Sequence, residues 1–174
     1  MRRQPATAIP AAIAPGPFVL DASRFALAKR QKLGGPGLRA FLGIAGLWGL
    51  TEVQRLLVLG LPPRSTYYAW GKAAQAGAAL TLPVDTLLRI SAVLGIHKAL
   101  RILFATDAEA VAWLRGPHAA LPFAGQPPLA LVAGGTQDGL MAVRRFLDAA
   151  RGGLYMPPTE ADPPPLTDAD IVFA

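Results

Sequence analysis

The stretch from Thr51 to Gln75 constrains the fold most strongly, because it carries two helix signals separated by a very short connection. Thr51 with Gln54 three residues later is the pattern of a capping box, which begins a helix. Gly60 suits the left-handed conformation that ends a helix, and Pro63 suits the first turn of the next one. The segment therefore predicts a helix-turn-helix, with the second helix starting a few residues after the first ends.

The second helix of this pair has two different faces. Tyr67, Trp70 and Ala74 recur at helical spacing, so we expect them to face the core. Polar and aromatic residues gather near the other face and the N-terminal end, where backbone N–H groups and the helix dipole favour phosphate. A recognition helix presents that end to base edges. The predicted DNA-contacting residues are Arg64, Ser65, Thr66, Tyr68 and Lys72.

The charge is divided unevenly along the chain, and the division agrees with a nucleic-acid partner. Residues 1–105 hold 13 lysines and arginines against three acidic residues, which gives a net charge of +10. Residues 106–174 hold four basic and eight acidic residues, which gives −4. A basic half favours a polyanionic partner, and an acidic half indicates a different task.

Helical periodicity extends over most of the chain and predicts an all-α fold. In the first half we expect Gly34–Gly37 to break the chain and a helix to follow over residues 38–48. The helix after Thr51 is expected to bury Val53, Leu56 and Leu57. A further helix should end at Gly95, and a separate short helix should cover residues 96–104. The face of the helix before Gly95 that we expect in the core carries Val84, Leu87, Leu88, Ser91 and Leu94.

The second half reads as a small helical module. A helix is expected over residues 107–115, with acidic residues in its first turn, as the helix dipole favours. A short helix should open at Pro127 or Pro128, and an amphipathic helix capped by Thr136 should follow it. The last residues, from about 157, are rich in proline and acids and are expected to be disordered alone.

Several function classes are disfavoured by composition. The chain has no cysteine, which excludes disulfides and fits a cytoplasmic location. Its longest uncharged run, residues 116–137, contains four prolines, so a membrane span is not expected. Two histidines, His97 and His118, do not supply a catalytic set or a metal site, and no phosphate-binding loop follows a strand. We therefore expect no enzymatic activity, no metal and no cofactor.

The chain resembles the Xre/MbcA/ParS-type antitoxins of bacterial RES–Xre toxin–antitoxin pairs. The resemblance lies in the ordered segments LGLPPRSTYYAW, LPVDTLLRISAVLGIHKALRILF, AWLRGPHAALPFAGQPPLALV and GLMAVRRFLDAARGGLY, within about residues 36–155. It implies an Xre-like helix-turn-helix bundle followed by a small helical toxin-binding domain. It also implies that the partner is a RES-domain toxin that depletes NAD, that the antitoxin covers the toxin's active site, and that the complex represses its own operon.

The resemblance also implies site residues. It assigns DNA reading to the five residues given above, and toxin contact to residues of the second half: Pro127, Pro128, Leu129, Arg144, Arg145, Gly152, Gly153, Leu154 and Tyr155. This chain continues for nineteen residues after Tyr155, whereas relatives commonly stop near that point. The acidic tail is therefore a second candidate for covering the toxin.

These observations divide the chain into a flexible basic leader (1–35), a helix-turn-helix domain (36–105), a toxin-binding domain (106–156) and an acidic proline-rich tail (157–174). We expect a homodimer, because a two-fold operator requires one, and a hetero-oligomer with the toxin. Two other readings stay open. The chain could be a free-standing helix-turn-helix regulator with a ligand-binding or oligomerisation module, or a protein-only adaptor without DNA binding.

Overall fold

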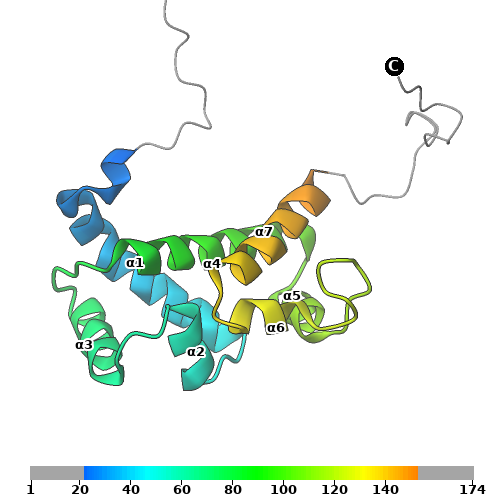
Figure 1. The fold of residues 1–174 in the computed structure, drawn as a ribbon, viewed down its shortest axis with the longest axis horizontal. Coiled ribbons are helices and arrows are strands. Elements are labelled where there is room, and N and C mark those ends of the chain that lie inside the picture. Colours follow the sequence, from blue (N-terminus) through cyan, green and yellow to red (C-terminus); the bar gives the residue numbers. More distant parts are fainter. Residues whose placement is uncertain (1–21, 153–174) are drawn as a thin grey trace, which may run out of the picture.

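A computed structural model describes residues 22–152, which form one short 3-10 turn and seven α-helices, with no strand among them (Figure 1). The all-α prediction is confirmed. The elements are η1 (Ala22–Phe25), α1 (Leu27–Leu47), α2 (Glu52–Val58), α3 (Arg64–Gln75), α4 (Val84–Leu103), α5 (Asp107–Arg115), α6 (Pro128–Ala133) and α7 (Gln137–Arg151).

The predicted break at Gly34–Gly37 is wrong, because α1 continues through it with Pro36 inside the helix. The predicted boundary of the leader at residue 35 therefore falls inside α1. Gly34 serves packing instead of ending the helix. A Cβ at Gly34 would overlap the backbone carbonyl of Leu80, in the connection between α3 and α4. Glycine lets that connection lie directly against α1, and this contact compensates for the poor helix propensity of the segment.

The helix-turn-helix prediction is confirmed by α2 and α3. Thr51 and Gln54 form the expected reciprocal capping box, with the Thr51 N–H donating to Gln54 Oε1 at 2.9 Å. Gly60 has a φ of +87°, the left-handed conformation expected of it. Of the three residues of α2 predicted to be buried, Leu56 is buried, Leu57 is partly buried and Val53 is 57% exposed. The helix buries Val58 in place of Val53.

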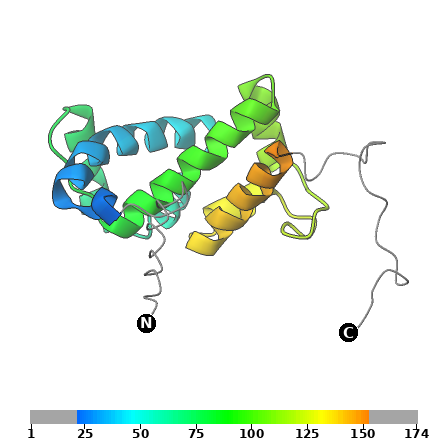
Figure 2. The same cartoon turned by 90° about the horizontal axis from the view of Figure 1, so that it is seen from above.

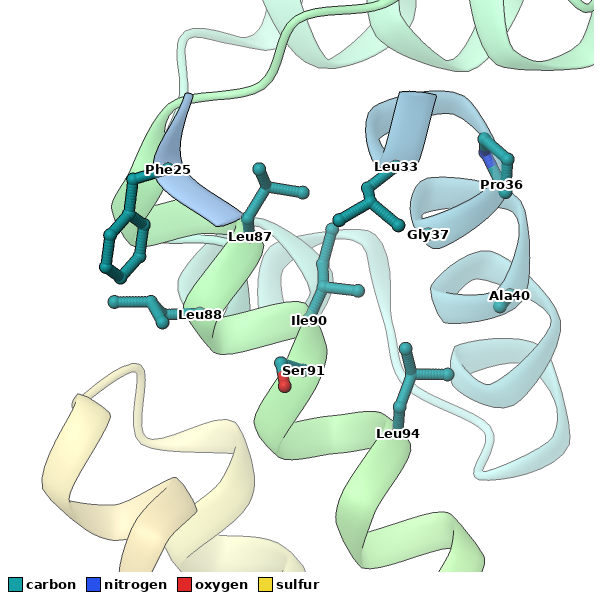
Figure 3. A pocket seen from close by; sticks show the side chains of 10 residues that line it. All are labelled: Phe25, Leu33, Pro36, Gly37, Ala40, Leu87, Leu88, Ile90, Ser91 and Leu94. Atoms are coloured by element: carbon teal, nitrogen blue, oxygen red, sulfur yellow. The ribbon is translucent and has the colours of Figure 1, made fainter. Parts of the chain in front are cut away.

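The predicted helix end at Gly95 is also wrong, since α4 is a single helix of 20 residues. Its buried face carries Ile90, Val93, Ile96 and Leu100, among others, and not the face that periodicity favoured. The predicted face instead borders an open apolar groove of about 460 Å³ between α1 and α4 (Figure 3). Leu87, Leu88, Ser91 and Leu94 line it from α4, and Leu33 and Ala40 are among the residues that line it from α1. Helix α4 therefore has two apolar faces, and the sequence alone does not show which of them is buried in the core.

Both halves of the chain are built on α4. Helix α1 packs on one side of α4 and α7 packs on another (Figure 2). Buried side chains from all seven helices form one hydrophobic cluster, which extends from Leu38 to Leu147. Polar contacts join the halves as well: Arg89 Nη1 donates to the carbonyl of Gly135 at 2.8 Å, and Arg115 Nη2 donates to that of Trp48 at 2.6 Å. The second half therefore has no core separate from α4.

Candidate nucleic-acid and partner-binding surfaces

Helix α3 carries all five predicted DNA-contacting residues on the outside of the bundle. Arg64, Ser65, Tyr68 and Lys72 are exposed, and Thr66 is partly buried. On the opposite face Tyr67 and Ala74 are buried, as expected, and Trp70 packs against the core at its edge. Within the described part of the chain no side chain caps the N-terminus of α3, which follows Pro63. The N–H groups of its first turn are therefore available to an anion.

Arg64 and Tyr68 both contact the carboxylate of Glu52, and the sequence did not predict this arrangement. Glu52, the first residue of α2, forms an ion pair with Arg64, with 3.2 Å between Oε1 and Nη2. The Tyr68 hydroxyl donates to Glu52 Oε2 at 2.6 Å. This hydrogen bond raises the pKa of Tyr68 above its usual value, because deprotonation would place two negative charges together. No spacing rule connects residues 16 positions apart, so only the turn geometry shows the contact.

A second feature of this surface is a shallow hollow beside α3, with a volume of about 400 Å³. Its lining includes Arg55 from α2 and Lys72 from α3, so two basic side chains border it. Arg55 is fixed by a hydrogen bond from its Nε to the carbonyl of Leu50, at 3.0 Å. Arg55 was not among the predicted contacts. It adds a fixed positive charge to the hollow beside Lys72.

The predicted toxin-contacting residues of the short helix α6 lie mostly in the core. Pro127 is the partly buried N-cap, while Pro128 and Leu129 are buried. They therefore set the position of α6 between α5 and α7 and offer little surface to a partner.

The arginines of α7 differ from each other. Arg145 is exposed, whereas Arg144 is partly buried and lies against Gly95 of α4, with its Nε 3.6 Å from Asp148 Oδ2. A Cβ at Gly95 would lie 2.8 Å from the Arg144 guanidinium, so the glycine makes room for this side chain. Gly152 is the exposed C-cap of α7. Gly153, Leu154, Tyr155 and the acidic tail lie outside the described residues.

The loop between α5 and α6 presents an exposed leucine that is not among the predicted contacts. Leu121 is 95% exposed, although its neighbour Phe123 is 2% exposed. Phe123 packs in a cluster of rings with Trp113, His118 and Phe146, with ring centroids 4.9 Å apart for both His118–Phe123 and Phe123–Phe146. The ring cluster anchors the loop, so the position of the exposed Leu121 is fixed relative to the bundle. The uncharged, proline-rich composition of the loop was the only signal in the sequence.

The lining of the apolar groove between α1 and α4 has few polar groups. Ser91 is the one polar side chain among the ten residues that line the apolar groove. No three histidine, aspartate or glutamate side chains of the described part gather as a metal site would require. Among the described helices, none has the length and apolar character needed to cross a bilayer.

Comparisons with known proteins agree with this division of surfaces. Residues 28–96 match the family model of the antitoxin Xre-like helix-turn-helix domain. Residues 99–153 match that of the antitoxin Xre/MbcA/ParS C-terminal toxin-binding domain. The chain is also 41% identical over 116 residues to the uncharacterized protein y4oB of Sinorhizobium fredii (strain NBRC 101917 / NGR234), an alignment that covers 67% of this chain and 84% of the relative. With a recognition helix in the first matched region and a partner-binding module in the second, the chain belongs to the Xre/MbcA/ParS family of antitoxins.

Proposed function

We propose that this antitoxin neutralises a RES-domain toxin that degrades NAD, by covering the toxin's active site, and that it represses its own operon through α3. The observation that carries the proposal is the pairing of the two matched domains on one chain, with an exposed recognition helix in the first. The proposed setting is the bacterial cytoplasm, where both NAD and operator DNA are present.

On the DNA side, we propose that Arg64, Ser65, Thr66, Tyr68 and Lys72 contact the operator. They lie at the N-terminal end and the outer face of α3, and the neighbouring Arg55 adds positive charge. Contacts of this kind release counterions, so binding should weaken steeply as salt rises. A homodimer would present two such helices to a two-fold operator.

The DNA assignment can be tested by replacing Arg64 and Tyr68 together with alanine. The double variant should lose binding to the promoter duplex upstream of its own gene, measured by fluorescence anisotropy, and should still neutralise the toxin. Ala69→Ser, a small change at an exposed position of the same helix, serves as a control that should bind normally. Wild-type affinity in the double variant would contradict the assignment.

On the toxin side, we propose that contact is made by residues of α7, by the residues that follow it and by the α5–α6 loop. Arg145 and Gly152 are proposed because they are exposed, and Gly153, Leu154 and Tyr155 because the family resemblance assigns them to the toxin. Leu121 is added because it is exposed on an anchored loop. Pro127, Pro128, Leu129 and Arg144 would act by holding these surfaces in place. A few residues usually supply most of the binding free energy of an interface, so single substitutions can test this set.

The toxin assignment can be tested by co-expression with a RES-domain protein encoded beside this gene. Wild-type antitoxin should restore growth and the cellular NAD level. Leu121→Asp should reduce both, and it should weaken the purified complex without lowering the melting temperature, because Leu121 makes little contact with the core. Leu61→Asp is a matched control, since Leu61 is also exposed but belongs to the turn before α3. If the toxin is inhibited but the NAD level never changes, the toxin class is wrong.

A further inference from the structure

We propose that Glu52 is a specificity-determining residue of the DNA-binding surface. The inference rests on the proposed DNA-binding function and deepens it. The Glu52 carboxylate would hold Arg64 and Tyr68 in the arrangement that fits the operator, and would disfavour sequences that cannot use that arrangement.

The geometry joins one acid to two predicted DNA contacts. Each oxygen of the Glu52 carboxylate has its own partner, Arg64 Nη2 at 3.2 Å and the Tyr68 hydroxyl at 2.6 Å. The three side chains therefore form a bridge between the first turn of α2 and the first two turns of α3. The bridge fixes the relative positions of two long side chains that would otherwise sample many rotamers.

Folding stability does not explain this bridge. The side chains of Arg64 and Glu52 are 67% and 37% exposed, and ion pairs this open to solvent contribute little to stability. Glu52 is favoured by the dipole at the start of α2, but that effect does not need the bridge, and the capping hydrogen bonds come from Thr51 and Gln54. A function in orienting the surface accounts for the arrangement better than a function in holding the fold.

The charge of Glu52 has a second effect. A carboxylate on a surface that meets DNA repels phosphates, so it lowers the affinity for every duplex. It also occupies Arg64, which would otherwise be free to bind any phosphate. In the operator complex the oriented Arg64 can reach a base edge, where arginine discriminates among bases. Glu52 thus opposes non-specific binding to DNA and supports specific binding to the operator.

The experiment compares Glu52→Gln with wild type on two probes, the promoter duplex of this gene and a scrambled duplex of the same composition. Affinities are measured over a range of salt concentrations. We expect the ratio of promoter to scrambled affinity to fall by about fivefold, the scale of one exposed charge contact. We also expect the salt dependence on the scrambled duplex to steepen by about one phosphate contact, because Arg64 is released.

The chain contains a closely matched control in Asp107→Asn. Asp107 follows Thr106, the N-cap of another capping box, just as Glu52 follows Thr51; Asp107 is exposed and Glu52 is partly buried. The substitution removes the same charge at the same helix position but away from α3, so the affinity ratio should stay at the wild-type value. Melting temperatures of both variants show that each is folded.

Coupling to Arg64 provides a second readout. In an Arg64→Ala background, Glu52→Gln should change the ratio far less than it does in the wild-type chain, because the residue it orients is gone. If the wild type prefers the promoter but Glu52→Gln leaves the ratio unchanged, the inference is overturned while the proposed function stands. If the wild type shows no preference for the promoter, the proposed DNA-binding function fails, and the inference fails with it.

Discussion

The surface around α3 and the surface around α6 and α7 differ in how their predicted residues are used. On α3 four of the five predicted residues are exposed, and two of them share contacts with Glu52. In the second half Pro128 and Leu129 are buried and Arg144 is wedged against Gly95, so Arg145 and Gly152 are the described predicted contacts that remain exposed. Polar residues such as those at the start of α3 stay on the surface, whereas the apolar residues of a short helix such as α6 are buried in the core.

The two regions nevertheless depend on the same helix. Because α4 packs on α1 and on α7, a change in α4 should reach both surfaces. The region after residue 105 would lose its main packing partner if it were expressed alone. Tests of either surface therefore need the full chain.

The largest effect is expected from Leu100→Ala. Leu100 is fully buried on α4, so the change should lower the free energy of unfolding by about 2–5 kcal/mol. Urea unfolding followed by far-UV circular dichroism should show one transition, shifted as a whole. Leu103→Ala, at an exposed position of the same helix, should change stability by less than about 1 kcal/mol. Two separate transitions would show that the halves fold independently.

A smaller loss is expected from Gly34→Ala in α1. The new methyl group would overlap the Leu80 carbonyl, a backbone group that cannot rotate away, so the free energy of unfolding should fall by about 1–3 kcal/mol. Gly43→Ala is the matched control, because nothing lies within 4 Å of its Cβ position in the same helix. It should raise stability by about 0.5–1 kcal/mol in thermal unfolding. Equal effects at both glycines would contradict the close packing of the α3–α4 connection on α1.

The two capping boxes allow the halves to be compared directly. Thr51→Ala and Thr106→Ala each remove a side chain that accepts a hydrogen bond from the backbone N–H three residues later. Each should cost about 0.5–2 kcal/mol of the free energy of unfolding. Since both caps serve one folded unit, both variants should shift the same chemical-denaturation transition. If hydrogen exchange shows that Thr106→Ala opens only a local segment, the two halves are not one cooperative folding unit.

The smallest effect concerns pH and His97. Burial lowers the pKa of His97 below 6.5; Arg101 acts in the same direction and Asp107 opposes it. The unfolded chain then binds the proton more readily, so the contribution of His97 is complete above about pH 6.5 and is lost as pH falls through the lower folded pKa. Wild type should lose more stability than His97→Gln between about pH 7 and pH 5. An equal loss in both proteins would contradict this expectation.

Short-range sequence signals predicted much of this fold. The remaining features depend on contacts between residues that are far apart in the sequence. The capping box at Thr51, the turn at Gly60 and the outward face of α3 follow from rules that act over a few residues. Helix α1 continues through Pro36 and α4 through Gly95. Gly34 of α1 lies against Leu80 and Gly95 against Arg144, and the sequence does not show that these distant residues become neighbours. Glu52 was missed for the same reason, because its partners become neighbours only after α2 and α3 have packed.

The most direct test is whether one antitoxin assembly holds toxin and operator together. In Figure 1 α3 and α7 lie toward opposite ends of the described bundle, and Figure 2 agrees. Mass measurement of the purified toxin complex, mixed with the promoter duplex, should therefore reveal one species containing protein, toxin and DNA. In the Arg64→Ala and Tyr68→Ala double variant, only DNA should be missing from that species. If toxin and promoter instead displace each other from the wild-type protein, the two surfaces are not separate, and the proposed arrangement is wrong.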